Sequence, residues 1–391
     1  MIYFLQAAAA ASMLLEVCLA FNATLAPPNG PFGVASTTAE LINAKMLDPY
    51  SPTKQERRLM ISAFYPVSEI GDCQKTRVPY MPAGTAAIYD QEYSSAGLPN
   101  GTFEAIQLTL CENTASKGLS KNKHPLAIFS PGLGDSRLLY SNIAASLAAQ
   151  GYIVVTVDHP YDADVVEFPN KDLVMSANIN DSDINQLDAA LAVRVKDLSF
   201  VIDQMRNRTV TRAILKNLYG KVNLAHVLMF GHSIGGAAAA STISQDHRAL
   251  GGVNLDGTLF GSVVSHGLDK PFMIFAHEGK NQSTDPSWAT IWPHLNSSKV
   301  QVSVLGSAHG TYMDFPLIID TLGLRAQLPP KVLAEEIGTV EGDRILTILT
   351  TYIDSFFQFV LRHPASPLLQ QDSPMFPEVI VANSTLGKKS R

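Results

Sequence analysis

Short apolar runs alternate with segments of helical periodicity through the second two-thirds of the chain. The runs are rich in Val, Ile, Leu and Phe, as buried strands are, and they cover residues 125–130, 152–157, 227–230, 252–255, 272–276 and 300–305. Segments with helical spacing cover 140–150, 184–205, 235–244 and 344–362. Strands that alternate with helices predict an α/β protein with a mostly parallel central sheet and helices on both faces.

Three parts of the chain depart from this rhythm. Two strand-like runs, 33–41 and 57–66, precede the alternation. The stretch 70–122 is rich in Gly, Pro, Ser and Asn, and we interpret it as an excursion from the main fold. The tail 364–391 is expected to be irregular. The sequence therefore predicts one domain over 21–391.

The first twenty residues have the character of a processing segment. An apolar run over 7–15 is followed by Cys18 and Ala20, small residues that suit cleavage after Ala20 and predict a signal peptide over 1–20. An uncleaved membrane anchor or a buried helix is the alternative. Seven N-x-S/T glycosylation sequons support the secretory route, at Asn22, Asn100, Asn180, Asn207, Asn281, Asn296 and Asn383. We therefore expect a secreted, extracellular glycoprotein.

The chain has three cysteines. Cys18 lies in the segment expected to be removed, which leaves Cys73 and Cys111 as an even pair for an oxidising compartment. We expect these two to form a disulfide, and two unpaired thiols are the alternative.

Composition and charge exclude some classes of function. Hydrophobic residues make up 46% of the 391 residues and charged ones 16%, which suits a large core under a modestly charged surface. The net charge is −6, and the short basic tail 388–391 is too small to form an electrostatic footprint for nucleic acid. No metal or cofactor is expected, and the sequence carries no signal for an oligomeric state.

The strongest chemical signal is the run Gly231-His232-Ser233-Ile234-Gly235. An apolar run precedes it and a helix-forming run of small residues follows, which is the strand–turn–helix context of a nucleophile elbow. The glycines are needed because the serine sits on a tight turn against neighbouring backbone. Ser233 is the predicted nucleophile, and a glycine-rich turn without catalysis is the alternative.

A serine hydroxyl needs a histidine to take its proton. In this class of enzyme the chain order is serine, acid, histidine. His309 follows the run 300–305, which would place it on a loop at the carboxyl edge of the sheet. His277, at the end of the run 272–276, is the rival base.

The acid must orient the histidine and stabilise its charged form. Asp256 ends the run 252–255, and Asp285 follows the run 272–276. Spacing alone favours Asp256 only modestly, so Asp285 stays open as the alternative.

Two backbone N–H groups must also face the negative charge that develops on the substrate oxygen. One belongs to the residue after the nucleophile, Ile234, and the other to a loop early in the sheet. The glycine-rich segment 130–134 ends the run 125–130, which makes the Leu133 N–H the predicted second donor. An ordinary turn between strand and helix is the alternative reading of this segment.

Six segments carry a family resemblance: FSPGLGDSRLLYS (129–141), GYIVVTVDHPYDAD (151–164), GHSIGG (231–236), NLDG (254–257), DPSW (285–288) and GSAHGTYMD (306–314). As a set they resemble the platelet-activating factor acetylhydrolase family, in its plasma and intracellular type II form, and especially its fungal secreted relatives. The resemblance extends from about residue 30 to about residue 378.

The resemblance implies an α/β-hydrolase fold and a Ca²⁺-independent serine lipase that removes a short or oxidised acyl group from the sn-2 position of a phospholipid. It assigns the nucleophile, acid, base and two oxyanion donors to Ser233, Asp256, His309, Leu133 and Ile234. It therefore favours Asp256 over Asp285. Two positions depart from the animal members, with Pro131 in place of His and Ile234 in place of a frequent Phe, and both line the acyl site.

The sequence therefore predicts a secreted serine esterase that works through an acyl-enzyme. Its partner would be a small ester or phospholipid substrate, with a possible peripheral contact to a lipid surface and no nucleic acid. A broad-specificity secreted carboxylesterase or polyester hydrolase is one alternative, and a non-catalytic binding protein of the same fold is another.

Overall fold

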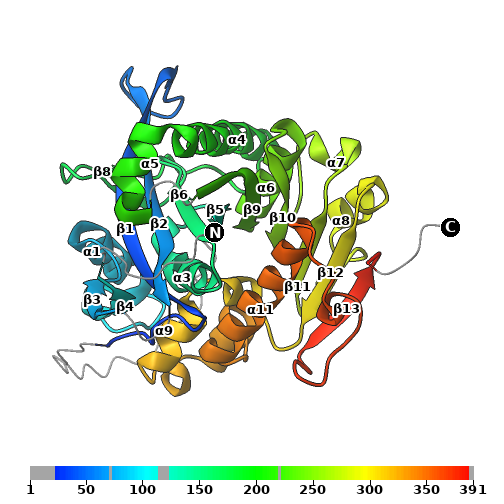
Figure 1. Cartoon of the computed structure of the whole chain (residues 1–391). Helices are drawn as coiled ribbons and strands as arrows, with labels where there is room; N and C mark the ends of the chain where they lie inside the picture. The colour runs from blue at the N-terminus through cyan, green and yellow to red at the C-terminus, as the bar shows by residue number, and fades with distance from the viewer. Residues whose placement is uncertain (1–22, 70–72, 113–122, 219–221, 387–391) are drawn as a thin grey trace.

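A nine-stranded sheet forms the centre of the molecule in the computed structural model, which describes residues 23–69, 73–112, 123–218 and 222–386 (Figure 1). In spatial order its strands are β1 (Phe32–Leu47), β2 (Glu56–Glu69), β6 (Ile153–Asp158), β5 (His124–Ser130), β9 (Val222–His232), β10 (Ala249–Leu255), β11 (Phe272–His277), β12 (Lys299–Val304) and β13 (Val379–Ser384). The strands from β6 to β12 run parallel, whereas β1, β2 and β13 are antiparallel to their neighbours. The predicted fold class, a mostly parallel sheet of the α/β-hydrolase type, is confirmed.

The central strands are apolar on both sides because both faces of the sheet are covered. All six residues of β6 are buried. Along β5, Leu126 and Ile128 face one hydrophobic core while Ala127 and Phe129 face the other. A parallel strand between two helix layers thus reads as a continuous apolar run.

Helices cover each face of the sheet (Figure 1). The core on one face includes residues of α4 (Ile184–Arg206) and α6 (Ile234–Gln245). The core on the other face includes residues of α3 (Ser141–Ala149), α9 (Phe315–Thr321) and α11 (Gly342–Val360). Four of these five helices, all but α9, lie within two residues of the bounds that sequence periodicity predicts.

The stretch 70–122 is more regular than its composition suggests. Strands β3 (Lys75–Pro79) and β4 (Gln107–Cys111) pair antiparallel, and helices α1 (Ala83–Ser94) and α2 (Thr102–Ala105) lie between them in sequence. Tyr80, Tyr89 and Phe103 are buried in the same core as α3 and α11. Aromatic side chains therefore anchor a segment whose small and polar residues hide its periodicity.

The predicted disulfide is present. Cys73 and Cys111 are bonded, with their Cα atoms 5.6 Å apart. Cys73 lies just before β3 and Cys111 is the last residue of β4, so the bond links the two ends of the segment that contains β3, α1, α2 and β4.

The C-terminal tail corrects the sequence prediction. Residues after 364 are predicted to be irregular, yet they contain β13, which pairs antiparallel with β12. Only Val379 of this strand is fully buried, because β13 lies at the edge of the sheet. An edge strand with one buried residue lacks the apolar run that marks a central strand.

Two predictions fall outside the described residues, the signal peptide over 1–20 and the sequon at Asn22. Among the helices that the structure describes, none is both long enough and apolar enough to span a bilayer.

Candidate active site

Ser233 stands on a strained turn between β9 and α6. Its φ is +56° and its ψ is −128°, a conformation that non-glycine residues rarely adopt. A Cβ atom at Gly231 would lie 2.2 Å from the carbonyl oxygen of Gly235, and one at Gly235 would lie 2.0 Å from that of Ser130. Both positions thus require glycine, and the turn leaves Ser233 half-buried at the carboxyl end of β9.

Asp256 and His309 meet at the same edge of the sheet. Asp256 directly follows β10, the parallel neighbour of β9, and is fully buried. His309 begins the short 3₁₀ helix η4 (His309–Tyr312), which follows β12. The Nδ1 atom of His309 lies 2.5 Å from Oδ2 of Asp256. The structure thus pairs the predicted acid with the predicted base.

His309 contacts His232, the residue that precedes the nucleophile. The two ring centroids are 4.5 Å apart, and Nε2 of His232 lies 3.0 Å from the backbone oxygen of His309. Because His232 immediately precedes Ser233, this contact fixes His309 beside the elbow.

The rival base, His277, also contacts the acid. Its Nδ1 lies 2.7 Å from Oδ2 of Asp256, and its backbone N–H donates to Oδ1 at 3.1 Å. Sequence reasoning treats His277 and His309 as alternatives, whereas the structure gives both to one carboxylate. Oδ2 of Asp256 is at hydrogen-bonding distance from both rings, so hydrogen bonds explain why the three side chains cluster. The carboxylate oxygen and the two ring nitrogens also lie within 4.8 Å of one another, which is close enough to bind a metal ion.

The rival acid, Asp285, has a structural role. It caps helix α8 (Pro286–Ile291) by accepting from the backbone N–H of Ser287 at 3.0 Å. Its Oδ2 accepts from the hydroxyl of Thr258 at 2.7 Å and lies 3.5 Å from Nζ of Lys280. None of these partners is a histidine.

Hydrogen bonds keep the Asp256 carboxylate charged in a buried place. Burial alone would raise its pKa, but hydrogen bonds from His277 and His309 and the charge of Lys280 outweigh burial and hold the pKa below its ordinary value. Asp256 is therefore an anion over the whole pH range in which a histidine base works.

Arg194 holds the loop that carries the predicted oxyanion donor Leu133. Its guanidinium donates to the backbone oxygens of Pro131 and, at 2.9 Å, of Gly132. The chain has no cis peptide among its described residues, so the Leu133 N–H points opposite to the Gly132 carbonyl and away from Arg194. The second predicted donor, the Ile234 N–H, belongs to the first residue of α6 and has no partner within the helix.

A buried network of hydrogen bonds and ion pairs holds Arg194 and the start of this loop in place. Arg194 is paired with Asp162, with Nε 2.7 Å from Oδ2. Ser130 Oγ lies 3.0 Å from Nε2 of His159, whose Nδ1 lies 2.9 Å from Asp197. Burial, with the charge of Arg194, lowers the pKa of His159. Sequence reasoning did not find these residues, although Ser130, His159 and Asp162 lie within the family-like segments.

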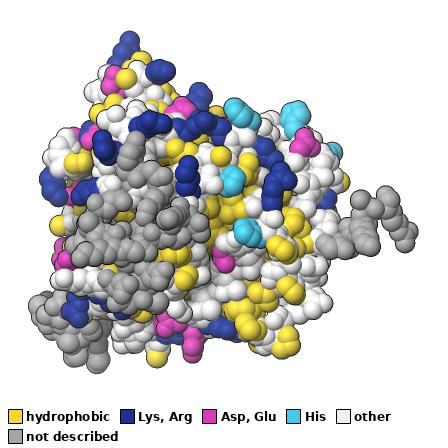
Figure 2. Space-filling model, in the orientation of Figure 1, with side chains coloured by type: hydrophobic (Ala, Val, Ile, Leu, Met, Phe, Trp, Pro, Cys, Tyr) yellow, Lys and Arg dark blue, Asp and Glu magenta, His cyan; other side chains and the backbone are white. Residues whose placement is uncertain are grey.

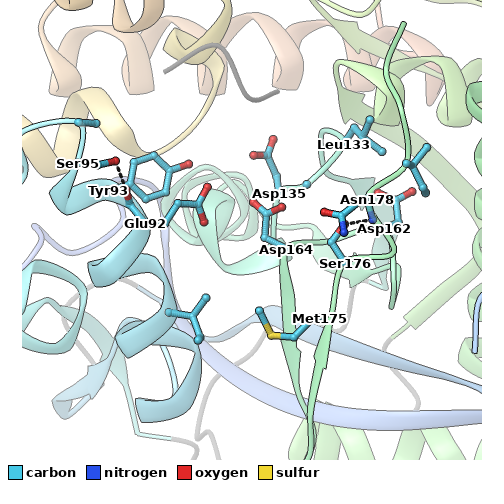
Figure 3. Close-up of a pocket in the computed structure, with 14 residues that line it drawn as sticks. Glu92, Tyr93, Ser95, Leu133, Asp135, Asp162, Asp164, Met175, Ser176 and Asn178 are labelled. Atoms are coloured by element: carbon cyan, nitrogen blue, oxygen red, sulfur yellow. Dashed lines mark hydrogen bonds between the residues drawn. The ribbon is translucent and has the colours of Figure 1, made fainter. Parts of the chain in front are cut away.

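An acidic cavity of about 480 Å³ lies beside Leu133. Four carboxylates line it, and those of Glu92, Asp135 and Asp164 converge on the same space (Figure 3). Burial and the neighbouring charges of Glu92 and Asp135 raise the pKa of Asp164 to about 8. Tyr93 and Met175 complete the wall, so the cavity combines negative charge with an aromatic ring and an apolar side chain.

The chain is similar to known esterases. The family model described as platelet-activating factor acetylhydrolase, isoform II, matches residues 54–330. A probable 1-alkyl-2-acetylglycerophosphocholine esterase of Arthroderma benhamiae is 32% identical over 375 residues, which cover 91% of this chain and 93% of that protein. The platelet-activating factor acetylhydrolase of Cavia porcellus is 27% identical over 214 residues, 49% of either chain. A ferulic acid esterase from Streptomyces cinnamoneus has a similar structure, with a TM-score of 0.76 and 28% identity over 93% of this chain and 100% of that chain.

Proposed function

Because the chain belongs to the platelet-activating factor acetylhydrolase isoform II family and is a carboxylic ester hydrolase, we propose that it cleaves the sn-2 ester of phospholipids that carry a short or oxidised acyl chain. The observation that carries the proposal is the contact between Asp256 and His309 beside the strained elbow of Ser233. The name of the Arthroderma relative, which aligns along nearly its whole length, supports this substrate class.

The reaction proceeds in two halves. Ser233 Oγ attacks the ester carbonyl carbon while Nε2 of His309 accepts the hydroxyl proton, and Asp256 stabilises the resulting imidazolium. The N–H groups of Leu133 and Ile234 bind the oxyanion. The bond to the glycerol oxygen then breaks, His309 returns the proton to that oxygen, and a lysophospholipid leaves an acyl-serine behind. Water, deprotonated by His309, hydrolyses the acyl-serine and restores Ser233.

The acidic cavity supports a substrate with a cationic head group. It adjoins the Leu133 end of the site, and its carboxylates Glu92, Asp135 and Asp164 repel one another when charged. A quaternary ammonium group would relieve this repulsion and could lie against the Tyr93 ring.

Exposed apolar side chains support a peripheral contact with lipid. Leu173 and Met175 of strand β8 (Leu173–Met175) are 42% and 46% exposed, and Met175 also lines the acidic cavity. Figure 2 shows further exposed hydrophobic side chains beside histidines, away from the edge of the molecule where β8 is labelled in Figure 1. We propose that the β8 strand touches the lipid surface while the substrate enters beside it.

Secretion and glycosylation belong to the same proposal. The disulfide suits an oxidising compartment. Asn383 is half-buried, and the asparagines of the other five described sequons are exposed: Asn100, Asn180, Asn207, Asn281 and Asn296. Expression in a eukaryotic secretory host, followed by glycosidase treatment, tests this: a fall in apparent mass is expected, and an unchanged mass would contradict glycosylation.

A second candidate function is that of a broad-specificity secreted carboxylesterase. The ferulic acid esterase, similar along the whole of its own length, favours it. The third possibility considered from the sequence, a non-catalytic binding protein, is set aside because the chain is a carboxylic ester hydrolase.

A substrate panel separates the two candidates. We expect glycerophosphocholines with an sn-2 acetyl group to be hydrolysed much faster than those with a long sn-2 chain, and to exceed p-nitrophenyl acetate and a polyester film in kcat/KM. Equal or better turnover of the simple esters would favour the broad carboxylesterase.

The nucleophile has its own test. A fluorophosphonate probe is expected to label Ser233, and Ser233→Ala should lower kcat by about 10⁶-fold because the triad acts as a unit. Near-normal hydrolysis by folded Ser233→Ala would contradict the acyl-serine.

A further inference from the structure

Two imidazoles converge on one oxygen of the Asp256 carboxylate. Nδ1 of His309 lies 2.5 Å from Oδ2 and Nδ1 of His277 lies 2.7 Å from the same atom. The side chains of both histidines are 31% exposed, whereas that of Asp256 is fully buried. The base of the reaction thus shares its acid with a second histidine.

His277 holds the carboxylate from two directions. Its ring contacts Oδ2, and its backbone N–H donates to Oδ1 at 3.1 Å. Asp256 itself has a φ of +57°, so its backbone is in a region where a side chain is costly. Lys280 fixes that backbone by donating to the Asp256 carbonyl oxygen at 2.7 Å.

From this geometry we propose that His277 is a positioning residue of the esterase reaction, which acts through Asp256 on the basicity and orientation of His309. The Nδ1–H of His277 fixes the carboxylate rotamer and draws part of the charge of Oδ2 away from His309. The inference rests on the proposed Ser233–His309–Asp256 mechanism, and it is independent of which ester is the natural substrate.

Other charged or titratable groups surround the shared carboxylate, and they stay in place when His277 is changed. They are Lys280 after β11, His232 at the end of β9 and Tyr312 in η4, and Asp285 lies against the same Lys280. A change of His277 alone therefore removes one donor from Oδ2 without altering these groups.

The direct test is His277→Phe, which keeps an aromatic ring and removes the donor. With p-nitrophenyl acetate and excess EDTA, we expect kcat to fall about tenfold with KM within about twofold, because the carboxylate loses the donor that fixes its rotamer and no longer holds His309 in the orientation that the transition state needs. The acidic limb of the kcat/KM profile should move to higher pH by about half a unit, because all of the Oδ2 charge then stabilises the His309 imidazolium.

Two matched variants accompany this test. His277→Asn retains an N–H donor near the position of Nδ1 and should restore much of kcat and of the pH profile. His247→Phe, an exposed histidine after α6, makes the same change of residue type away from the site and should leave both unchanged. A folded His277→Phe enzyme with wild-type kcat and an unmoved acidic limb would overturn the proposal.

A double-mutant cycle shows whether His277 acts through Asp256. In an Asp256→Ala background, His277→Phe should have almost no further effect on kcat. An undiminished tenfold loss in that background would overturn the proposal. Labelling of the wild type by the fluorophosphonate probe is measured first, because an unlabelled Ser233 would be a failure of the proposed mechanism and not of the role of His277.

Discussion

At the scale of single residues, the site depends on buried groups that do not touch the substrate. Arg194 is 1% exposed and donates to the Asp162 carboxylate, to the Ser130 hydroxyl and to the backbone carbonyls of residues 131 and 132. A guanidinium can satisfy these together because its donors form a planar fork, whereas an ammonium is a point charge. The orientation of the Gly132–Leu133 peptide thus depends on a side chain of α4.

Arg194→Lys should therefore weaken the oxyanion hole while keeping the charge. We expect kcat to fall about 10²-fold with little change in KM, as on loss of one oxyanion donor, measured by steady-state kinetics. Arg137→Lys is the matched control, because Arg137 is 2% exposed and paired with Asp158 but does not donate to the 131–132 carbonyls. Equal losses of kcat in the two variants would contradict the role given to Arg194.

The residues that the sequence could identify are those whose neighbours in the chain define their role. The glycines beside Ser233 identify it as the nucleophile, and the strand before His309 identifies it as the base. Asp256 and Asp285 both follow strands, so position alone could not decide between them without the family resemblance. The roles of His277 and Arg194 come from contacts with residues 21 and 62 positions away, which no local pattern encodes.

At the scale of elements, the sequence predicts best the strands that are buried on both faces. The runs at β5, β6 and β11 lie within about two residues of the observed strands, because a parallel central strand is apolar throughout. Strands β3 and β13 were not predicted because they bury at most one residue each, and β4 was not predicted because it is short and alternates with partly buried positions. The disulfide between Cys73 and Cys111 was predicted only because these two cysteines form an even pair.

The disulfide between Cys73 and Cys111 leads to a prediction about stability. Replacing Cys73 and Cys111 together by Ala should lower the free energy of unfolding by up to about 4 kcal/mol, because the bond closes a separation of 38 residues. Thermal unfolding with and without a reducing agent measures the loss. Reduction should destabilise the wild type and leave the double variant unchanged, and a wild type insensitive to complete reduction would contradict the prediction.

At the scale of the whole molecule, buried acids set how stability responds to pH. Burial raises the pKa of Asp314 to about 7, and burial with neighbouring acids raises that of Asp164 to about 8. Both groups bind a proton in the folded state at pH values where the unfolded chain has already released it. These two groups therefore lower the free energy of unfolding as pH rises from about 4 towards 8.

Buried histidines oppose this trend only at lower pH. Burial lowers the pKa of His159 and His232 from 6.5, so the unfolded chain takes up protons below about pH 6.5 that the folded state does not. Their contribution to stability is present above pH 6.5 and is lost as pH falls through that value. Between pH 6.5 and 8 the two raised carboxyl groups therefore act without this opposition.

We expect the free energy of unfolding, measured by urea titration, to decrease steadily from pH 6.5 to pH 8. Asp314→Asn and Asp164→Asn should each flatten the decrease, because an amide cannot lose the proton that burial favours. Asp188→Asn, on the exposed face of α4, is the control and should leave the slope unchanged. A wild type whose stability is constant or rises over this range would contradict the raised pKa values of Asp314 and Asp164.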